Sequence, residues 1–307
     1  MSKKNRRKPS RTRAQASRAN AAQAAHANTS PATAPAKPAR AVIPFVERPF
    51  EGLAAEPDLV AMREILPLAT LPARTKDGHD VIFATILPSM SAALRRADGT
   101  LLVAIQTVMS SGDASLDIAA RITRGQDLAP GEVFQVSEQP EPGPRLADIL
   151  DPDGFGELTL HEEPSFWMTD EDAAKPENQQ ALQDARERLV PTRAVEGVDR
   201  AFWCRMNREF VRWVRPEPRD AVLDGLARLR ASGDFSFDDS RFVGAFRALG
   251  LIIPVWELQR GSEADELAGP MAEFAPRLEA AIASTEPLSP EEKRARAGIV
   301  SRQVSLR

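Results

Sequence analysis

The sequence predicts an α+β fold, in which antiparallel sheets carry helices on one face, preceded by a disordered basic tail. The order strand, strand, helix occurs twice within residues 196–307, which is typical of antiparallel layers rather than of a parallel nucleotide-binding sheet. The first 46 residues contain ten Lys and Arg residues, no acidic residue and too few apolar side chains for a core. The order strand, strand, helix, strand in the first half suggests a diverged duplication of a ββαββα-type unit.

Charge divides the chain into a tail and a body. The chain has 40 basic and 44 acidic residues, so the residues after position 46 hold 30 basic against 44 acidic side chains, a formal charge of −14. An acidic body repels phosphate, and any affinity for RNA, DNA or the ribosome must come from the tail. The alternative is a solubilising extension. The tail residues predicted to bind nucleic acid are Lys3, Lys4, Arg6, Arg7, Lys8, Arg11, Arg13 and Arg18.

We predict four segments along the chain. They are the tail at 1–41, a first α+β subdomain at 42–155, a connector at 156–195 and a second α+β subdomain at 196–307. In the first subdomain, an apolar stripe predicts a short helix at 57–66 that Pro67 ends. The apolar runs 81–87 and 101–108 predict paired strands, followed by a helix between Asp113 and Gly125, a strand at 133–136 and a helical turn at 146–150.

The connector and the second subdomain have clearer end signals. Thr169 with Asp172 resembles a capping box, and the helix after it has only a thin apolar stripe. Strands are predicted at 201–206 and 210–214, then a helix from Asp220 to Gly233 with an exposed Asp224–Arg228 pair. A hairpin at 242–258 turns at Leu249-Gly250. The last predicted helix carries Met271, Phe274, Leu278 and Ile282, and we expect Pro276 to kink it or mark its start.

Two groups of residues are candidate ligand sites. Trp203 and Trp213, with Arg205 and Arg212 on the same hairpin, would form a stacking platform for bases or a peptide. Packing in the core is the alternative that we favour. Ser110, Ser111 and Asp113 precede a helix and would bind an anion at its first turn, although simple capping of the helix is the favoured alternative.

Composition excludes several kinds of chemistry. The chain has no tyrosine for a tyrosine nucleophile, and its one cysteine, Cys204, excludes an intramolecular disulfide and a zinc site of several cysteines within one chain. No glycine-rich phosphate loop or hydrolase elbow is present. His161, Glu162 and Glu163 are adjacent in an extended segment, so their side chains alternate between two faces and do not predict a metal site. We therefore predict no cofactor, no metal and no catalytic residues.

Five strings resemble an uncharacterised bacterial family of domains of unknown function. They are VERPFEGL (Val46 to Leu53), SSGD (Ser110 to Asp113), GVDRAFWC (Gly197 to Cys204), GLIIPVWEL (Gly250 to Leu258) and RARAGIVSRQVSL (Arg294 to Leu306). Proteins of that family are often labelled preprotein translocase SecA-like, because a SEC-C zinc motif precedes the domain. This chain has no cysteine before Cys204, so it lacks that motif. The resemblance implies no catalytic residues.

These observations predict a non-enzymatic binding protein. No apolar run is long enough to span a bilayer and no signal peptide is present, so we expect no membrane insertion and a cytoplasmic location. The tail would anchor the protein to RNA, DNA or the ribosome, while the body binds a protein or a small ligand. The alternatives are an accessory or chaperone-like factor in translation or protein export, and an enzyme with an unfamiliar site. The sequence leaves the oligomeric state open.

Overall fold

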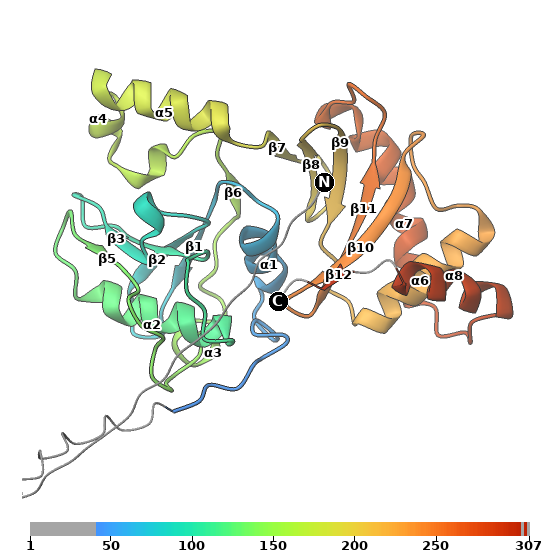
Figure 1. Cartoon of the computed structure of the whole chain (residues 1–307), viewed down its shortest axis with the longest axis horizontal. Helices are drawn as coiled ribbons and strands as arrows, with labels where there is room; N and C mark the ends of the chain where they lie inside the picture. Colours follow the sequence, from blue (N-terminus) through green and yellow to red (C-terminus); the bar gives the residue numbers. More distant parts are fainter. Residues whose placement is uncertain (1–40, 302–303, 306–307) are drawn as a thin grey trace, which may run out of the picture. The chain divides into compact units, whose positions relative to one another are not determined.

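The computed structural model describes residues 41–301 and 304–305, and it confirms the α+β fold class. Two largely antiparallel sheets are packed with helices (Figure 1). The strand order is β5-β3-β4-β2-β1-β6 in the first sheet and β12-β10-β11-β9-β8-β7 in the second. In the described part of the chain, no helix is both long and apolar enough to cross a membrane.

The first sheet is built from short strands. They are β1 (Ala69–Arg74), β2 (Asp80–Ala84), β3 (Ala93–Arg95), β4 (Leu101–Ala104), β5 (Val133–Phe134) and β6 (Thr159–Leu160). The predicted pairing of the apolar runs 81–87 and 101–108 is confirmed as β2 with β4, and the two strands are parallel. The parallel direction arises because a 3-10 turn, η1 (Pro88–Met90), and β3 reverse the chain before β4 begins. Strands β1, β3 and β6 were not predicted from the sequence.

Both faces of the first sheet are covered. On one face lie α1 (Glu56–Glu64), α2 (Ala114–Gln126) and α3 (Leu146–Ile149), which share a core with the inward-facing residues of the strands. The other face holds a smaller cluster that includes Leu94 and Leu102, and against it pack Phe166 and Trp167 from the 3-10 turn η2 (Ser165–Trp167). Alternate apolar residues along the strands therefore point to opposite faces and contribute to two separate cores.

The connector contains α4 (Asp170–Ala173) and α5 (Pro176–Arg188), and it leads to β7 (Thr192–Ala194) at the edge of the second sheet. The Thr169 hydroxyl accepts a hydrogen bond from the Asp172 amide, which confirms the predicted helix start. Leu182 is the buried residue of α5, as the thin apolar stripe indicated. Because α5 buries so little surface, its position depends on contacts at its two ends.

The second sheet follows the predicted order of elements over residues 201–283, and the helix and the strand after them were not predicted. Its other strands are β8 (Ala201–Arg205), β9 (Glu209–Trp213), β10 (Arg241–Ala248), β11 (Leu251–Glu257) and β12 (Val304–Ser305), and its helices are α6 (Arg219–Ser232), η3 (Ala264–Glu266), α7 (Ala268–Ala283) and α8 (Pro290–Val300). The φ angles of Leu249 and Gly250, 46° and 89°, form the predicted tight turn between β10 and β11. Gly233 ends α6 with a φ of 87°.

Of two expectations for these helices, the second is wrong. Helix α7 begins at Ala268, so Pro276 lies inside it and does not mark its start, and the alternative of a kink at Pro276 stays a prediction. Asp224 and Arg228 do not pair with each other. Asp224 instead binds Arg296 of α8 at 2.6 Å, and Arg228 donates to the carbonyl groups of Ala281 and Glu286. The i,i+4 ion pair does not form, because both side chains bind residues in or beside the neighbouring helices instead.

Helix α1 joins the two halves of the body. Leu59, Val60 and Met62 are fully buried in a core that includes residues from both sheets, among them Phe83 and Ile253. At the start of the helix, Glu56 accepts two hydrogen bonds from Arg48, at 2.6 and 2.8 Å. Asp58 pairs at 3.2 Å with Arg200, which directly precedes β8. The two sheets are therefore connected by shared apolar packing and by ion pairs.

The two sheets share a strand order but not all strand directions. Their central strands are ordered β1-β2-β4-β3 and β8-β9-β11-β10, which is the same pattern in chain order. The middle pair is parallel in the first sheet and antiparallel in the second, where α6 separates β9 from β10. The diverged duplication stays a prediction, because a simple copy would preserve both the order and the directions.

Close packing of α6 on α7 gives a test of the second core. A Cβ atom on Gly225 would lie 2.6 Å from Ile282 Cγ1 and 2.8 Å from the Ile282 backbone nitrogen. Gly225→Ala should lower the free energy of unfolding by about 1–3 kcal/mol, because the helices must separate. Gly298→Ala in α8, where a Cβ meets no atom within 4 Å, should raise it by about 0.4–1 kcal/mol. Urea unfolding of both variants tests this, and equal effects would contradict it.

Candidate functional site

The edge strands of the two sheets meet at one pocket, which we name the edge groove. It has a volume of about 400 Å³, within the range of ligand-binding pockets. Strand β6 ends the first sheet and β7 ends the second, and the connector between them runs through α4 and α5 (Figure 1). The groove is lined by residues 67–68, 160–162, 186 and 189–194.

Strand β6 presents backbone groups to this groove. Leu160 is paired with Ala69 of β1, and the His161 amide donates to the Leu68 carbonyl at 3.0 Å. In an antiparallel pair, successive residues direct their N–H and C=O groups alternately toward and away from the partner strand. The backbone groups of Leu160 therefore face away from β1, and Leu160 lines the groove.

Strand β7 repeats this arrangement from the second sheet. The Pro191 carbonyl accepts from Arg205 at 3.0 Å, and the Val195 amide donates to the Ala201 carbonyl at 2.9 Å. Residues 191 and 195 thus face β8, and by alternation the backbone groups of Thr192 and Ala194 face away from it. Both residues line the groove, so two sheet edges supply main-chain donors and acceptors to one pocket.

The charged side chains of the groove are unevenly paired. Glu162 forms an ion pair with Arg186 of α5, whereas its distance to Arg193 Nη2 is 4.0 Å, at the limit of an ion pair. The Arg193 side chain is 63% exposed. One carboxylate therefore faces two guanidinium groups, and the positive charge of Arg193 is the less compensated.

His161 contributes a neutral ring to the groove. Its Nε2 atom lies 2.8 Å from the Thr70 hydroxyl, and its ring lies 4.7 Å from that of Phe166. Burial lowers the pKa of His161 below its usual 6.5, because desolvation disfavours the imidazolium ion. The ring is therefore uncharged at neutral pH and adds no charge to that of Arg193.

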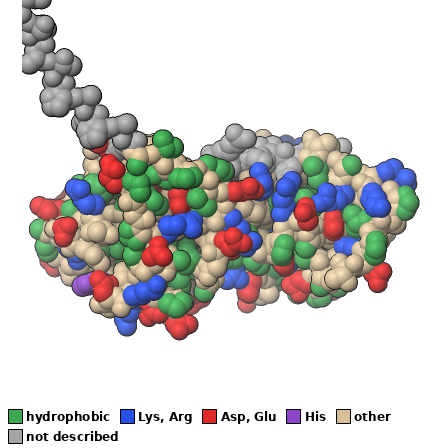
Figure 2. Space-filling model, turned by 90° about the horizontal axis from the view of Figure 1, so that it is seen from below, with side chains coloured by type: hydrophobic (Ala, Val, Ile, Leu, Met, Phe, Trp, Pro, Cys, Tyr) green, Lys and Arg blue, Asp and Glu red, His purple; other side chains and the backbone are tan. Residues whose placement is uncertain are grey.

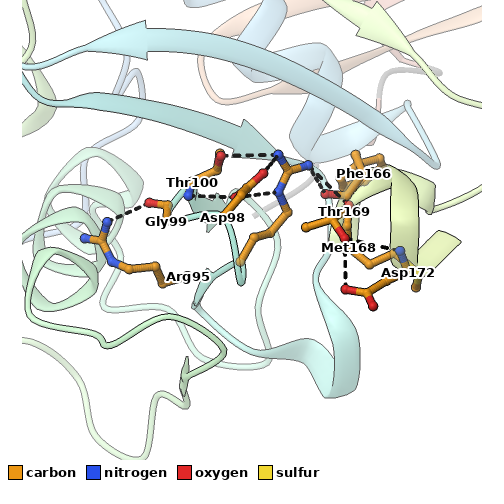
Figure 3. Close-up of polar contacts among 9 residues, drawn as sticks. Arg95, Asp98, Gly99, Thr100, Phe166, Met168, Thr169 and Asp172 are labelled. Atoms are coloured by element: carbon orange, nitrogen blue, oxygen red, sulfur yellow. Dashed lines mark hydrogen bonds and ion pairs between the residues drawn. The ribbon is translucent and has the colours of Figure 1, made fainter.

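Helix α5 forms one wall of the groove, and the segment before α4 anchors it to the first sheet. The guanidinium group of Arg96 donates to the carbonyl groups of Phe166 and Met168, both at 3.3 Å, and to the carboxylate of Asp98; these three acceptor residues are labelled in Figure 3. The Trp167 indole donates to the Ile86 carbonyl at 3.0 Å. These bonds hold residues 166–168 on the first sheet, and the Thr169 cap then directs the chain into α4 and α5.

The predicted stacking residues lie in the second core. Trp203 and Trp213 are 2% and 1% exposed, and their indole N–H groups donate to the Ser262 and Asp199 carbonyl groups. Arg205 lies 5.0 Å above the Trp203 ring and forms ion pairs with Glu209 and Glu263. Arg212 is on β9, and its neighbour across the hairpin is Phe202. Buried rings offer no surface to a base, so the structure shows the packing alternative.

The predicted anion site is filled by side chains of the protein. Asp113 caps α2 and accepts from the Ser115 and Leu116 amides. Asp117, which is 3% exposed, accepts from the Ser111 amide at 3.0 Å and from the Ser110 hydroxyl at 3.3 Å. Two carboxylates therefore occupy the donors that an anion would need, as the capping alternative expects.

The remaining predictions concern the tail and metal sites. The basic residues from Lys3 to Arg18 lie outside the described residues. Within the described part of the chain, no three His, Cys, Asp or Glu side chains are grouped as metal ligands. On the face of the body shown in Figure 2, acidic and basic side chains are interspersed. Burial raises the pKa of the Cys204 thiol, which is inaccessible in β8.

The edge groove was not predicted from the sequence. His161 and Glu162 were weighed only as metal ligands, and residues 156–195 were predicted to be a connector without a site. The short strands β6 and β7 have two and three residues, too few for an alternating pattern. Their position at the ends of two sheets depends on pairing with residues that are distant in the sequence. The only sequence feature that could have indicated the groove was the polar segment at 161–163 beside a weakly amphipathic helix.

The fold and the groove define a two-sheet α+β protein with strand edges that face a common pocket. The chain belongs to a family of unknown function, DUF5926, whose model matches residues 49–307. This match confirms the resemblance to an uncharacterised domain, and it carries no support for the SecA-like or SEC-C label. No curated protein and no solved structure matches the chain.

Amide exchange tests the outward direction of the β7 backbone groups. The Ala194 amide should exchange rapidly because it faces the groove, whereas the Val195 amide, bonded to Ala201 and in a buried residue, should be strongly protected. We expect at least a hundredfold difference in exchange rate between these neighbours by NMR. Equal protection of the two amides would show that Ala194 has a hydrogen-bond partner and would contradict the edge assignment.

The Arg96 contact gives a pH-dependent test. Hydrogen bonds from Arg96, and then from the Thr100 amide, lower the pKa of Asp98 from its ordinary 3.8 to about 2. Because this pKa is lowered by folding, the ionised carboxylate stabilises the folded state above about pH 4, and this contribution is lost as the pH falls toward 2. NMR titration should give a midpoint near 2, which rises toward 3.8 in Arg96→Gln. Arg74→Gln, at the separate Arg74–Asp80 pair, should leave it unchanged. A wild-type midpoint near 3.8 would contradict the proposed contact.

Proposed function

We propose that this protein is a non-enzymatic cytoplasmic binding protein. Its basic tail anchors it to the phosphate backbone of nucleic acid, and its body binds a protein ligand at the edge groove. The observation that carries the first part is the separation of charge, with ten basic and no acidic residues before position 47 and a formal charge of −14 on the rest. Clusters of Lys and Arg bind phosphate through counterion release, largely without regard to sequence.

The body supports this division of roles. Many of its arginines already have carboxylate partners within the protein, which reduces the positive potential available to a phosphate. Such pairs occur in both sheets and in the helices, and they include Arg48–Glu56, Arg145–Asp113, Arg205–Glu263 and Arg296–Asp220. Nucleic-acid binding by the whole protein should therefore depend on the tail.

The edge groove favours a second, related function. An accessory or chaperone-like factor in translation or protein export must contact chain segments that are not yet folded, and open strand edges can pair with such segments. A tail bound to ribosomal RNA would hold the groove close to them. Co-sedimentation with ribosomes tests this function, because the full chain should sediment with ribosomes and residues 41–307 should not.

Salt dependence tests the tail anchor. Binding of labelled duplex DNA and single-stranded RNA should be measured with the full chain and with residues 41–307, which form one compact unit. The full chain alone should bind. The variant with Arg6→Gln, Arg7→Gln and Lys8→Gln should reduce the slope of log K against log salt by about 2.7 for DNA and about 2.1 for RNA, which is three phosphate contacts.

Control substitutions at two later basic residues of the tail make this test specific. Lys37→Gln with Arg40→Gln removes two positive charges outside the predicted nucleic-acid contacts, so the slope should not change. Equal affinity of residues 41–307 and the full chain would overturn the anchor, as would an affinity that does not depend on salt. The comparison of DNA with RNA identifies the preferred nucleic acid.

A further inference from the structure

We propose that the edge groove binds an extended peptide that carries a carboxylate, by adding it as a strand to β7. This inference rests on the proposed function, because it specifies the ligand of the body. The peptide backbone pairs with Thr192 and Ala194, its apolar side chains occupy the walls of the groove, and its carboxylate pairs with Arg193. Each part of the proposal depends on a different observation.

The first step concerns the main chain. Thr192 and Ala194 are two residues apart on one edge, and each directs one N–H and one C=O group away from β8. This is the spacing of the hydrogen-bonded residues in an antiparallel ladder, so an extended segment can form two pairs of bonds with β7. Leu160 directs its backbone groups away from β1 across the same pocket. Strand addition of this kind derives its affinity from the main chain.

The second step concerns the walls. Leu68, Leu160, Leu189 and Val190 line the groove beside these backbone groups. Alternate side chains of an added strand point to opposite sides, so the residues directed at these walls would be apolar. The volume of about 400 Å³ accommodates a segment of a few residues and is too small for a folded domain. The ligand is therefore a short extended segment.

The third step concerns charge. Arg186 already neutralises Glu162, while Arg193 lies 4.0 Å from the same carboxylate and is largely exposed. His161 remains neutral at pH 7, since burial lowers its pKa. The unbalanced charge is thus one guanidinium group, whose planar donors fit a carboxylate. The carboxylate of the ligand belongs either to an Asp or Glu side chain or to a free chain terminus.

Two peptide libraries displayed on phage test the proposal against the full chain. One presents random heptapeptides with a free C-terminus and the other presents them within a longer chain. Enrichment of peptides with Asp or Glu in both libraries identifies the side-chain carboxylate, whereas enrichment in the first library alone identifies the terminal carboxylate. The most enriched peptide is then synthesised, and its affinity is measured by fluorescence anisotropy.

Variants of the edge strands test the backbone pairing. Ala194→Pro removes an outward N–H group without removing a bond to β8, so it should weaken binding at least tenfold with an unchanged melting temperature. The matched control is Val133→Pro on β5, at the opposite edge of the first sheet and outside the groove, which should not change the affinity.

The selected peptide supplies a test that needs no protein variant. N-methylation at alternate amides should abolish binding, while N-methylation at the intervening amides should preserve it.

Charge variants test the carboxylate contact. Arg193→Gln should weaken binding about tenfold and remove the preference for a carboxylate over its amide, as expected for the loss of a charge-assisted hydrogen bond. Arg188→Gln, on the exposed surface of α5 and outside the groove, removes the same charge and should have no effect.

Three results would overturn the proposal. They are the absence of any enriched peptide, binding that Ala194→Pro and alternate N-methylation leave unchanged, and concentration-dependent dimerisation of the full chain that Ala194→Pro abolishes. The last result would show that β7 pairs with a second copy of this chain. Because none of these experiments involves the tail, the peptide proposal can fail while the nucleic-acid anchor holds, and the reverse is equally distinguishable.

Discussion

The structure depends on the burial of α1 with two carboxylates at its first turn. Glu56 is 5% exposed, and a buried carboxylate is tolerated only with a partner, which Arg48 supplies through two hydrogen bonds. Asp58 is similarly paired with Arg200, although burial still raises its pKa. These pairs orient the helix, and its apolar side chains then contribute to a core shared by both sheets. Neither sheet could lose α1 without exposing part of that core.

This shared core determines where the strand edges lie. Residues between the sheets must connect β6 to β7, and they do so through a polar helix that buries little of its own surface. Arg96 and Trp167 hold one end of the connector on the first sheet, while β7 holds the other end on the second. The resulting pocket contains edge backbone groups from both sheets, so the linkage of the halves also creates the candidate site.

The separation of charge has a consequence for the proposed function. Arginines in the body are largely engaged with neighbouring carboxylates, as in the Arg208–Glu257–Arg241 cluster on the second sheet. The tail has no acidic residues to engage its own charges. In the function proposed above, the tail therefore attracts phosphate while the body binds a protein segment, with little competition between the two interactions.

The sequence by itself determined the fold class, the charge division and most local elements of the second half. These features could be predicted because local sequence patterns indicate them strongly, such as the turn at Leu249-Gly250, the end of α6 at Gly233 and the buried apolar stripe of α7. Only the tertiary structure decided the parallel β2–β4 pair, the partners of Asp224 and Arg228, and the burial of Trp203 and Trp213. The edge groove belongs to this second group, because strand edges are defined by pairings between distant residues, and two- or three-residue strands carry no periodic pattern of their own.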